Sequence, residues 1–300
     1  MASGAPGLNV RLIAEGEVLP GLFLGRREYD ITPDLVQTYI AGTGDDHPWY
    51  TGASPFGGPV APALLRHSEV YSYPGWYLRN VYGNLHAKQE FELFHPILVG
   101  ERVVSSAQIV DRYVRRNRDY VVNEATLYGV DGRILMRGRT HQSFLREPAP
   151  GDVVVDKERE RSGERRFDID PAGALEEVPP VTKTITDDMC FAFSGPERNY
   201  HNDREAARAL GFPDIVVQGM MTICFLSEMM TRRFGQGWFC GGKLQVNLVN
   251  VVWGGDTITA RGLVREIEPV GSRRRARCDV WAEKPDGTKV VIGTASAMLS

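Results

Sequence analysis

The sequence is poor in cysteine, and its first half contains none. Cys190, Cys224, Cys240 and Cys278 all lie in the second half. Their spacing does not match the close pairing of a zinc site or of a redox motif. We therefore expect these residues to be buried thiols in a reducing compartment.

Several other motifs are absent. The sequence has no glycine-rich dinucleotide motif, no phosphate-binding loop and no paired-histidine zinc motif, which disfavours nucleotide-dependent and zinc-hydrolase functions. No apolar run approaches the ~20 residues that span a bilayer, and residues 1–7 lack the apolar segment of a signal peptide. We expect a cytoplasmic protein without a bound metal or redox cofactor.

The charge balance is ordinary. A formal net charge of −3 over 300 residues, with 24% charged and 42% hydrophobic residues, is typical of a globular chain. An excess of basic residues, which would indicate a nucleic acid or an anionic membrane as partner, is missing. We expect neither kind of partner.

The sequence repeats itself. Gly100 and Asp131, each at the start of a turn or strand, correspond to Gly255 and Asp286, 155 residues further on in both cases. Two landmarks at one offset indicate an internal duplication. Each copy has about 150 residues, the size of one domain.

The repeat extends to a helix start in each copy. Thr32 and Thr186 can each cap a helix, and each is followed by carboxylates that suit the first turn. We predict an N-terminal domain over residues 1–147, a charged and proline-rich linker over 148–178, and a C-terminal domain over 179–300.

The second copy gives the clearest fold signal. Residues 219–233 are apolar nearly all round, which predicts a buried helix. Strands are expected after it, and they cover residues 238–250, 255–267, 273–284 and 288–299. An antiparallel meander after a buried helix predicts an α+β hotdog fold, in which the sheet wraps the helix. With the same elements in the first copy, the two sheets can pair side by side as a tandem (double) hotdog, and a homodimer is plausible.

A loop before the buried helix carries a recognisable motif. The chain has Ser194, Gly195, His201 and Asp203 at the spacing of Ser-Gly-Asp-x-Asn-Pro-x-His-x-Asp, followed by Gly219-Met220 at the helix start. This resembles the MaoC-like, R-specific enoyl-CoA hydratases and the two-domain dehydratases of fatty-acid-synthase type.

The resemblance implies a hydro-lyase that adds water to a 2-enoyl thioester. It assigns His201 to acid/base catalysis and the Gly219 amide to the thioester carbonyl. A free amide at a helix N-terminus suits a developing enolate charge. The family's catalytic Asp position is Pro196 here, which cannot transfer a proton, so Glu197, Asn199 or a water is expected to assist His201.

Further residues are candidates for contact with the substrate. They are Ser194, Asn199, Tyr200, Gln218, Asp45 and His86. In the first copy, Asp45 stands at the catalytic Asp position and Tyr50 at the His position, while Pro62, which has no amide hydrogen, falls near the place of Gly219. We therefore expect one active site per chain, in the second copy.

The predicted activity is reversible hydration of an acyl thioester in fatty acid or polyketide metabolism. Coenzyme A or an acyl carrier protein would present the substrate. Three alternatives stay open: a hotdog thioesterase, a cyclase that uses a substrate hydroxyl in place of water, and a non-catalytic acyl-binding subunit.

Overall fold

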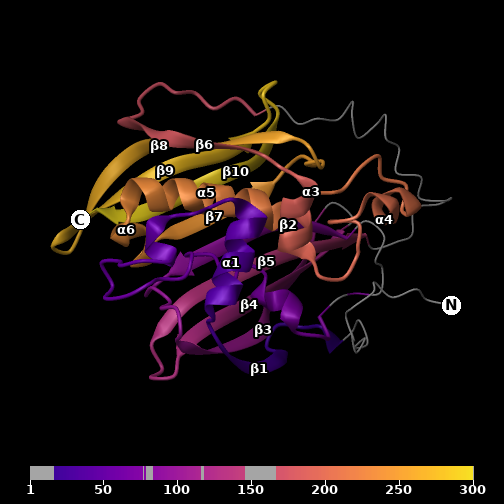
Figure 1. The fold of residues 1–300 in the computed structure, drawn as a ribbon, viewed down its shortest axis with the longest axis horizontal. Helices are drawn as coiled ribbons and strands as arrows, with labels where there is room; N and C mark the ends of the chain where they lie inside the picture. Colours follow the sequence, from indigo (N-terminus) through magenta and orange to yellow (C-terminus); the bar gives the residue numbers. More distant parts are fainter. Residues whose placement is uncertain (1–16, 77, 79–83, 116–117, 146–166, 300) are drawn as a thin grey trace.

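The computed structural model describes residues 17–76, 78, 84–115, 118–145 and 167–299. Its centre is one antiparallel sheet of ten strands, with helices packed on one face (Figure 1). The strands are β1 (Phe23–Asp30), β2 (Leu85–Leu93), β3 (Arg102–Arg115), β4 (Arg118–Gly129), β5 (Ile134–Leu145), β6 (Glu176–Thr184), β7 (Lys243–Leu248), β8 (Thr257–Val270), β9 (Arg273–Glu283) and β10 (Lys289–Leu299).

The strand order repeats the duplication seen in the sequence. It is β1-β3-β4-β5-β2 in the first half and, read from the other edge, β6-β8-β9-β10-β7 in the second. The halves join where β2 pairs with β7, from Lys88 opposite Asn247 to Glu92 opposite Lys243. The predicted side-by-side pairing of two hotdog sheets is confirmed.

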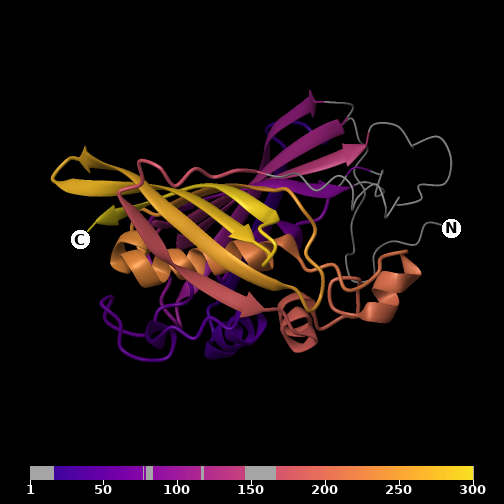
Figure 2. The ribbon, with the colours of Figure 1, turned by 90° about the horizontal axis from the view of Figure 1, so that it is seen from above.

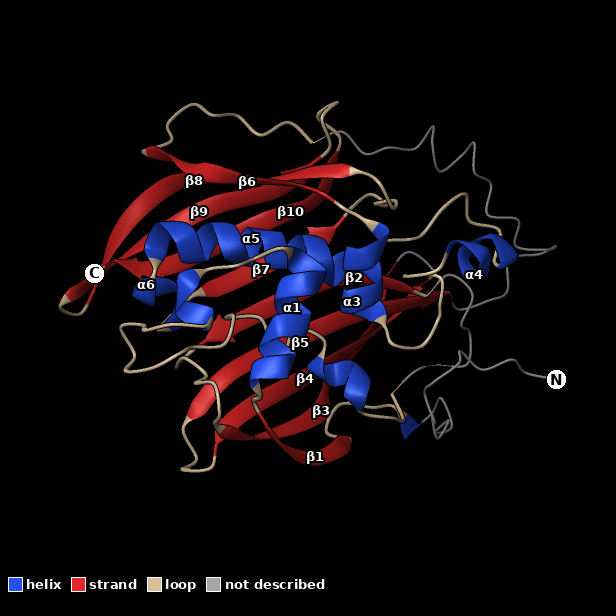
Figure 3. Cartoon of the chain, viewed as in Figure 1, coloured by secondary structure: helices blue, strands red, loops and turns tan. Residues whose placement is uncertain are grey.

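Helices lie on the concave face of this sheet (Figures 2 and 3). They are α1 (Pro33–Thr43), the 3-10 helices η2 (Pro48–Tyr50) and η3 (Glu69–Ser72), α3 (Asp187–Ser194), α4 (Arg204–Ala209), α5 (Gly219–Phe234) and α6 (Gln236–Phe239). Thr32 and Thr186 cap α1 and α3 through their side chains, as predicted. Among the described residues, no helix is both long and apolar enough to cross a membrane.

Helix α5 is the core of the second half. It begins at Gly219, where the apolar run predicted it, and thirteen of its sixteen residues are buried. The helix is therefore enclosed by the sheet rather than laid on its surface.

The second helix that was expected in the first half does not form over residues 61–76. Residues 61–76 form turns and the short η3, where a counterpart of α5 was expected. Pro74 contributes to this, because it lacks an amide donor and disfavours helix at the residue before it. The interior of the first hotdog is thus covered by an irregular segment.

One predicted strand is shorter than expected. Residues 236–239 form α6 rather than strand, and β7 begins only at Lys243. Gly241 has a φ of +124°, a conformation that L side chains rarely adopt, and it ends the helical turn before β7. The strand predicted over 238–250 was therefore too long at both ends.

The connection between the two halves runs from β5 to β6. The first half's last strand, β5, ends at Leu145, and β6 begins at Glu176. Most of the predicted linker over 148–178 lies outside the described residues, and its last three residues belong to β6.

Candidate active site

The loop between α3 and α4 is held by its own amide side chains. Asn199 Nδ2 donates to the carbonyls of Ser194 (3.0 Å) and Glu197 (2.9 Å), while Asn199 Oδ1 accepts from the His201 amide (2.8 Å). Asn202, which is buried, donates to the Glu197 carbonyl at 3.0 Å. These bonds fix the backbone on both sides of His201.

His201 is tied to the segment that leads into α5. Its Nδ1 lies 2.7 Å from the Val216 carbonyl, and the Val216 amide donates to the Tyr200 carbonyl at 3.1 Å. Because a carbonyl only accepts, Nδ1 carries the proton and Nε2 keeps its lone pair. Burial lowers the pKa of His201 to about 4, against the opposing effect of the Val216 carbonyl. The imidazole is therefore neutral at physiological pH, with a free basic nitrogen.

Gly219 is the first residue of α5 and lies three positions after Val216. The preceding Gln218 provides no side-chain cap, and no described residue accepts a hydrogen bond from the Gly219 amide. The positive end of the helix dipole adds to this free donor. The basic nitrogen of His201 and the free amide of Gly219 thus lie on two segments that are joined by hydrogen bonds at Val216.

Space at the helix start is tight. A Cβ built on Gly219 would lie 2.0 Å from Cδ2 of Leu248, which is the far end of a flexible side chain. A side chain at this position therefore requires Leu248 to move or to be shortened.

This geometry allows a test of the Gly219 amide. In Gly219→Pro/Leu248→Ala the donor is removed, while proline suits the first helical position and Gln218 already has the extended conformation (φ −62°, ψ 125°) that precedes proline. We expect kcat for hydration to fall by about 10²–10³-fold. The matched control, Gly219→Ala/Leu248→Ala, keeps the amide and should keep most activity. Equal rates in the two double variants would exclude a role for this amide.

Among the described residues, neither Glu197 nor Asn199, which were expected to assist His201, forms a hydrogen bond with its imidazole. Glu197 is exposed, and its carboxylate forms no hydrogen bond or ion pair with the described residues. Asp203 caps α4, since its Oδ1 accepts from the Ala206 amide at 2.8 Å. The side chain of Asn199 is engaged in hydrogen bonds that order the loop. The assignment of an assisting group to Glu197 stays a prediction.

Three of the predicted substrate contacts lie next to this site in the chain. The ring of Tyr200 lies 3.9 Å from that of His201, centroid to centroid. The Ser194 hydroxyl is buried without a partner among the described residues, so it can still donate or accept. Gln218 precedes Gly219, and its carbonyl accepts from the Met221 amide at 2.9 Å.

Asp45 lies elsewhere. It is buried, its Oδ2 accepts from the Tyr50 hydroxyl at 2.8 Å, and burial raises the pKa of its carboxyl despite that bond. Its charge acts on Glu228 of α5, nine residues beyond Gly219 and so about 14 Å along the helix. The structure therefore places Asp45 near Glu228, in the second half of α5.

Charged side chains that were not predicted from the sequence lie around Asp45. The carboxylate of Glu228 is fully buried and pairs with Lys183 of β6 at 2.8 Å and with Arg232 at 2.5 Å. Lys183 also donates to the Gly44 carbonyl at 2.5 Å, so it joins the two halves of the chain. We call Asp45, Tyr50, Lys183, Glu228 and Arg232 the inter-domain charge cluster. The signal for it was a lone Glu inside an otherwise apolar helix.

His86, the last predicted contact, lies in the first half on β2. Its Nε2 is 3.0 Å from Gln89 Oε1, and burial lowers its pKa to about 4.

In the described ranges, no group of three His, Cys, Asp or Glu side chains could hold a metal ion. The four cysteines are unpaired; three are buried and Cys240 is partly so.

Comparison with known proteins agrees with this architecture. Residues 168–280 match the family model of the MaoC like domain. A search of curated proteins gave no significant match.

Solved structures match over nearly the whole chain. A MaoC-like dehydratase superposes with a TM-score of 0.71 at 17% identity, covering 94% of this chain and 98% of the other. A MaoC-like dehydratase from Phytophthora capsici gives 0.69 at 14% identity, with 96% and 99% covered. A Mycobacterium tuberculosis protein described as a double hotdog gives 0.58 at 14% identity, with 91% and 93% covered. The chain has the double hotdog fold of these structures, and most of its second half is similar to the MaoC like domain.

Proposed function

We propose that the protein catalyses reversible addition of water to a 2-enoyl thioester, at a site formed by His201 and Gly219. The thioester would be carried by coenzyme A or an acyl carrier protein. The observation that carries the proposal is the hydrogen bond of His201 Nδ1 to the Val216 carbonyl, which leaves Nε2 basic and joins the imidazole to the segment before α5.

In the hydration direction, Nε2 of His201 takes a proton from water as the oxygen attacks C3 of the enoyl group. Negative charge then moves to the thioester oxygen, where the Gly219 amide and the helix dipole stabilise it. The imidazolium returns the proton to C2, so that water is added and the enzyme is regenerated. One base can therefore serve both proton transfers. The mechanism then needs no carboxylate at Pro196, which stands at the position of the family's catalytic Asp.

The low pKa of His201 gives a pH dependence. Because the pKa is lowered from 6.5 to about 4, the basic form persists as pH falls and is lost only near pH 4. We expect kcat/KM to stay level from about pH 8 to about pH 5 and then to decline. A profile of kcat/KM against pH checks this. A half-maximal value near pH 6.5, typical of an exposed histidine, would contradict the assignment.

The same shift affects folding. The lowered pKa of His201 contributes stability that is present above the ordinary value of 6.5 and is lost as pH falls through about 4. Acid unfolding followed by circular dichroism should therefore begin at higher pH in the wild type than in His201→Gln. Identical acid transitions would show that the imidazole is not desolvated.

Product analysis tests the function itself. The protein is incubated with a panel of 2-enoyl-CoA thioesters, and mass spectrometry is used to look for a product heavier by one water. Hydration predicts this product, and the reverse reaction from 3-hydroxyacyl-CoA. Free coenzyme A with a carboxylic acid would instead identify a thioesterase. Binding without any product would identify an acyl-binding subunit.

A further inference from the structure

Tyr200 stands directly before His201, and its ring touches the imidazole. The two ring centroids are 3.9 Å apart, and the planes are tilted by 39°. The ring of Phe212 stacks on that of Tyr200, with centroids 5.8 Å apart and planes 29° apart. The Tyr200 carbonyl accepts from the Val216 amide at 3.1 Å. Packing on Phe212 and the bond to Val216 therefore hold the phenol beside the imidazole.

The hydroxyl of Tyr200 has no hydrogen-bond partner among the described residues, although the side chain is half-buried. A tyrosine whose ring is enclosed usually finds a partner for its hydroxyl. The hydroxyls of several other tyrosines are bonded to side chains, namely those of Tyr29, Tyr50, Tyr71 and Tyr73. The Tyr200 hydroxyl is not sealed inside the protein either, so a water molecule or a ligand can reach it.

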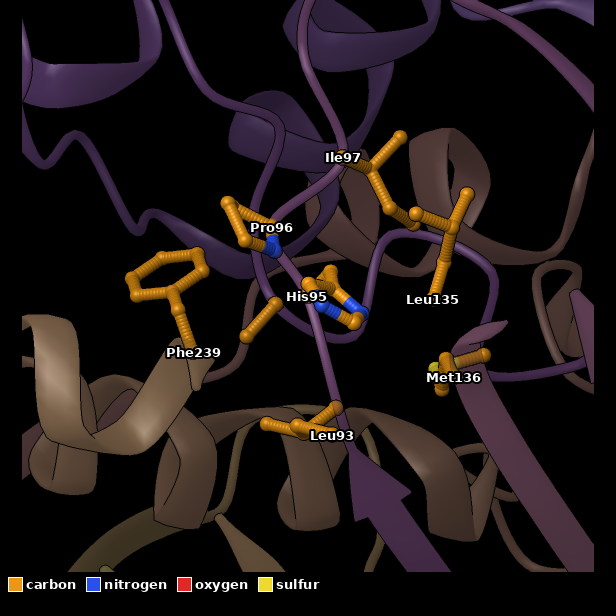
Figure 4. A pocket seen from close by; sticks show the side chains of 8 residues that line it. Leu93, His95, Pro96, Ile97, Leu135, Met136 and Phe239 are labelled. Carbon is orange, nitrogen blue, oxygen red and sulfur yellow. The ribbon is translucent and has the colours of Figure 1, made fainter. Parts of the chain in front are cut away.

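Nε2 of His201 is unpaired in the same way. Nδ1 donates to the Val216 carbonyl at 2.7 Å, and no described residue bonds Nε2. Because the two rings touch, the Tyr200 hydroxyl and Nε2 are within reach of one another through water. This place is not the cavity of Figure 4, which is bounded mainly by apolar side chains such as Leu93 and Phe239. It is defined by two polar atoms that lack protein partners.

The phenol of Tyr200 is neutral. Burial raises its pKa above the ordinary value of 10, and no charged side chain of the described residues contributes to the shift. The hydroxyl therefore keeps its proton at physiological pH, where it can donate one hydrogen bond and accept others. It can orient a polar group, but it does not act as a base.

The proposed mechanism leaves one hydrogen of the attacking water without a partner. Nε2 of His201 accepts the first hydrogen, and Pro196 offers no side-chain acceptor for the second. A water molecule that has one partner can rotate about that bond, whereas a second partner fixes the direction of its lone pairs. Holding a reactant in the productive orientation lowers the barrier of the reaction.

From these observations we infer that Tyr200 holds the attacking water together with His201. The phenol oxygen accepts one hydrogen of the water, Nε2 takes the other as a proton, and a lone pair of the water oxygen is directed at C3. In the dehydration direction the same hydroxyl donates a hydrogen bond to the departing 3-hydroxyl group. The phenol gives up no proton in either direction, so His201 still performs both proton transfers. The inference rests on the proposed function, because it assumes hydration at His201.

Tyr200→Phe tests the inference, because it removes the hydroxyl and keeps the ring. We expect kcat for hydration of a 2-enoyl-CoA to fall by about 10–100-fold while KM changes by less than about twofold, since the water and not the thioester loses a contact. Steady-state kinetics of wild type and variant measure both constants. An unchanged kcat in the folded variant would overturn the inference.

The pH profile separates contact with the water from an effect on the imidazole. Phenylalanine keeps the apolar ring against His201, so kcat/KM should decline near pH 4 in wild type and in Tyr200→Phe alike. A decline that moves toward pH 6.5 in the variant would show that Tyr200 acts by shielding the imidazole from solvent. That result would also overturn the inference.

Tyr128→Phe is the matched control. Tyr128 follows Leu127 on β4, and Leu127 belongs to the core, so the Tyr128 side chain lies on the opposite face of the sheet from α5. Its hydroxyl also has no hydrogen-bond partner among the residues that the structure describes. Tyr128→Phe should hydrate at the wild-type rate. An equal loss of kcat in both variants would count against a specific role of Tyr200.

Folding and the proposed function are checked separately. The melting temperature of Tyr200→Phe should stay close to that of wild type, because the hydroxyl has no protein partner to lose. If this variant does not fold, Tyr200→Met takes its place, since methionine fills irregular space, and wild-type kcat in that folded variant would overturn the inference. Absence of hydration by wild type would refute the proposed function, whereas hydration by wild type and Tyr200→Phe at equal rates refutes only the role of Tyr200.

Discussion

Replacing His201 by alanine is expected to lower kcat for hydration of a 2-enoyl thioester by about 10²–10⁴-fold, the range for loss of a general acid/base. The physical reason is that Nε2 of His201 performs both proton transfers in the proposed mechanism, since Nδ1 donates to the Val216 carbonyl. Steady-state rates at neutral pH measure the effect. His201→Gln should lower kcat in the same way, because a glutamine amide can occupy the space of the imidazole but cannot accept a proton at neutral pH.

The control for this experiment is another histidine. His47 lies before η2 in the first half, where its Nδ1 accepts from the Trp49 amide at 3.3 Å. His47→Gln should hydrate at the wild-type rate. If His201→Ala retains wild-type activity while remaining folded, the proposed site is wrong, and the assisting role predicted for Glu197 falls with it.

Removing Glu228 is expected to cost about 3–5 kcal/mol of folding free energy near pH 8, the cost of breaking a buried ion pair. Glu228→Ala leaves Lys183, which is only 13% exposed, without its carboxylate partner. Chemical denaturation followed by fluorescence measures the loss. Glu228→Gln keeps the shape and hydrogen-bonding capacity, so its loss should be smaller. A change below about 0.5 kcal/mol in Glu228→Ala would show that the inter-domain charge cluster contributes little.

The sign of the pH dependence follows from burial. Desolvation and the nearby charge of Asp45 raise the pKa of Glu228 from 4.5 to about 7, although Lys183 and Arg232 oppose the change. The folded state therefore binds a proton that the unfolded state has already released. The resulting stability is present below pH 4.5 and is lost as pH rises through about 7. Glu228→Gln should remove this dependence between about pH 5 and pH 8, and an equal slope in both proteins would contradict the assignment.

Much of the fold could be predicted from the sequence because it depends on local patterns and on the repeat. The apolar run from Gly219 predicted α5 with one residue missing at its end. The common offset of Gly100 and Asp131 to their counterparts predicted two copies of one strand order, as the sheet confirms. Local caps at Thr32 and Thr186 were also found, since a cap depends on only a few residues.

What could not be predicted depends on contacts between the halves. Substrate contact by Asp45 stays a prediction, but its position near Glu228, 183 residues away in the chain, could not be predicted from the sequence. The repeat also predicted a second helix in the first half, and it does not indicate that residues 61–76 form turns and η3 instead.

The measurement that tests the central claim most directly follows the conjugated-thioester absorbance and free thiol in the same reaction of wild-type protein with a short 2-enoyl-CoA. The account predicts that absorbance is lost while no thiol appears, because water adds to C3 and the thioester stays intact. Release of thiol at the rate of absorbance loss, or no change in either signal, would contradict it.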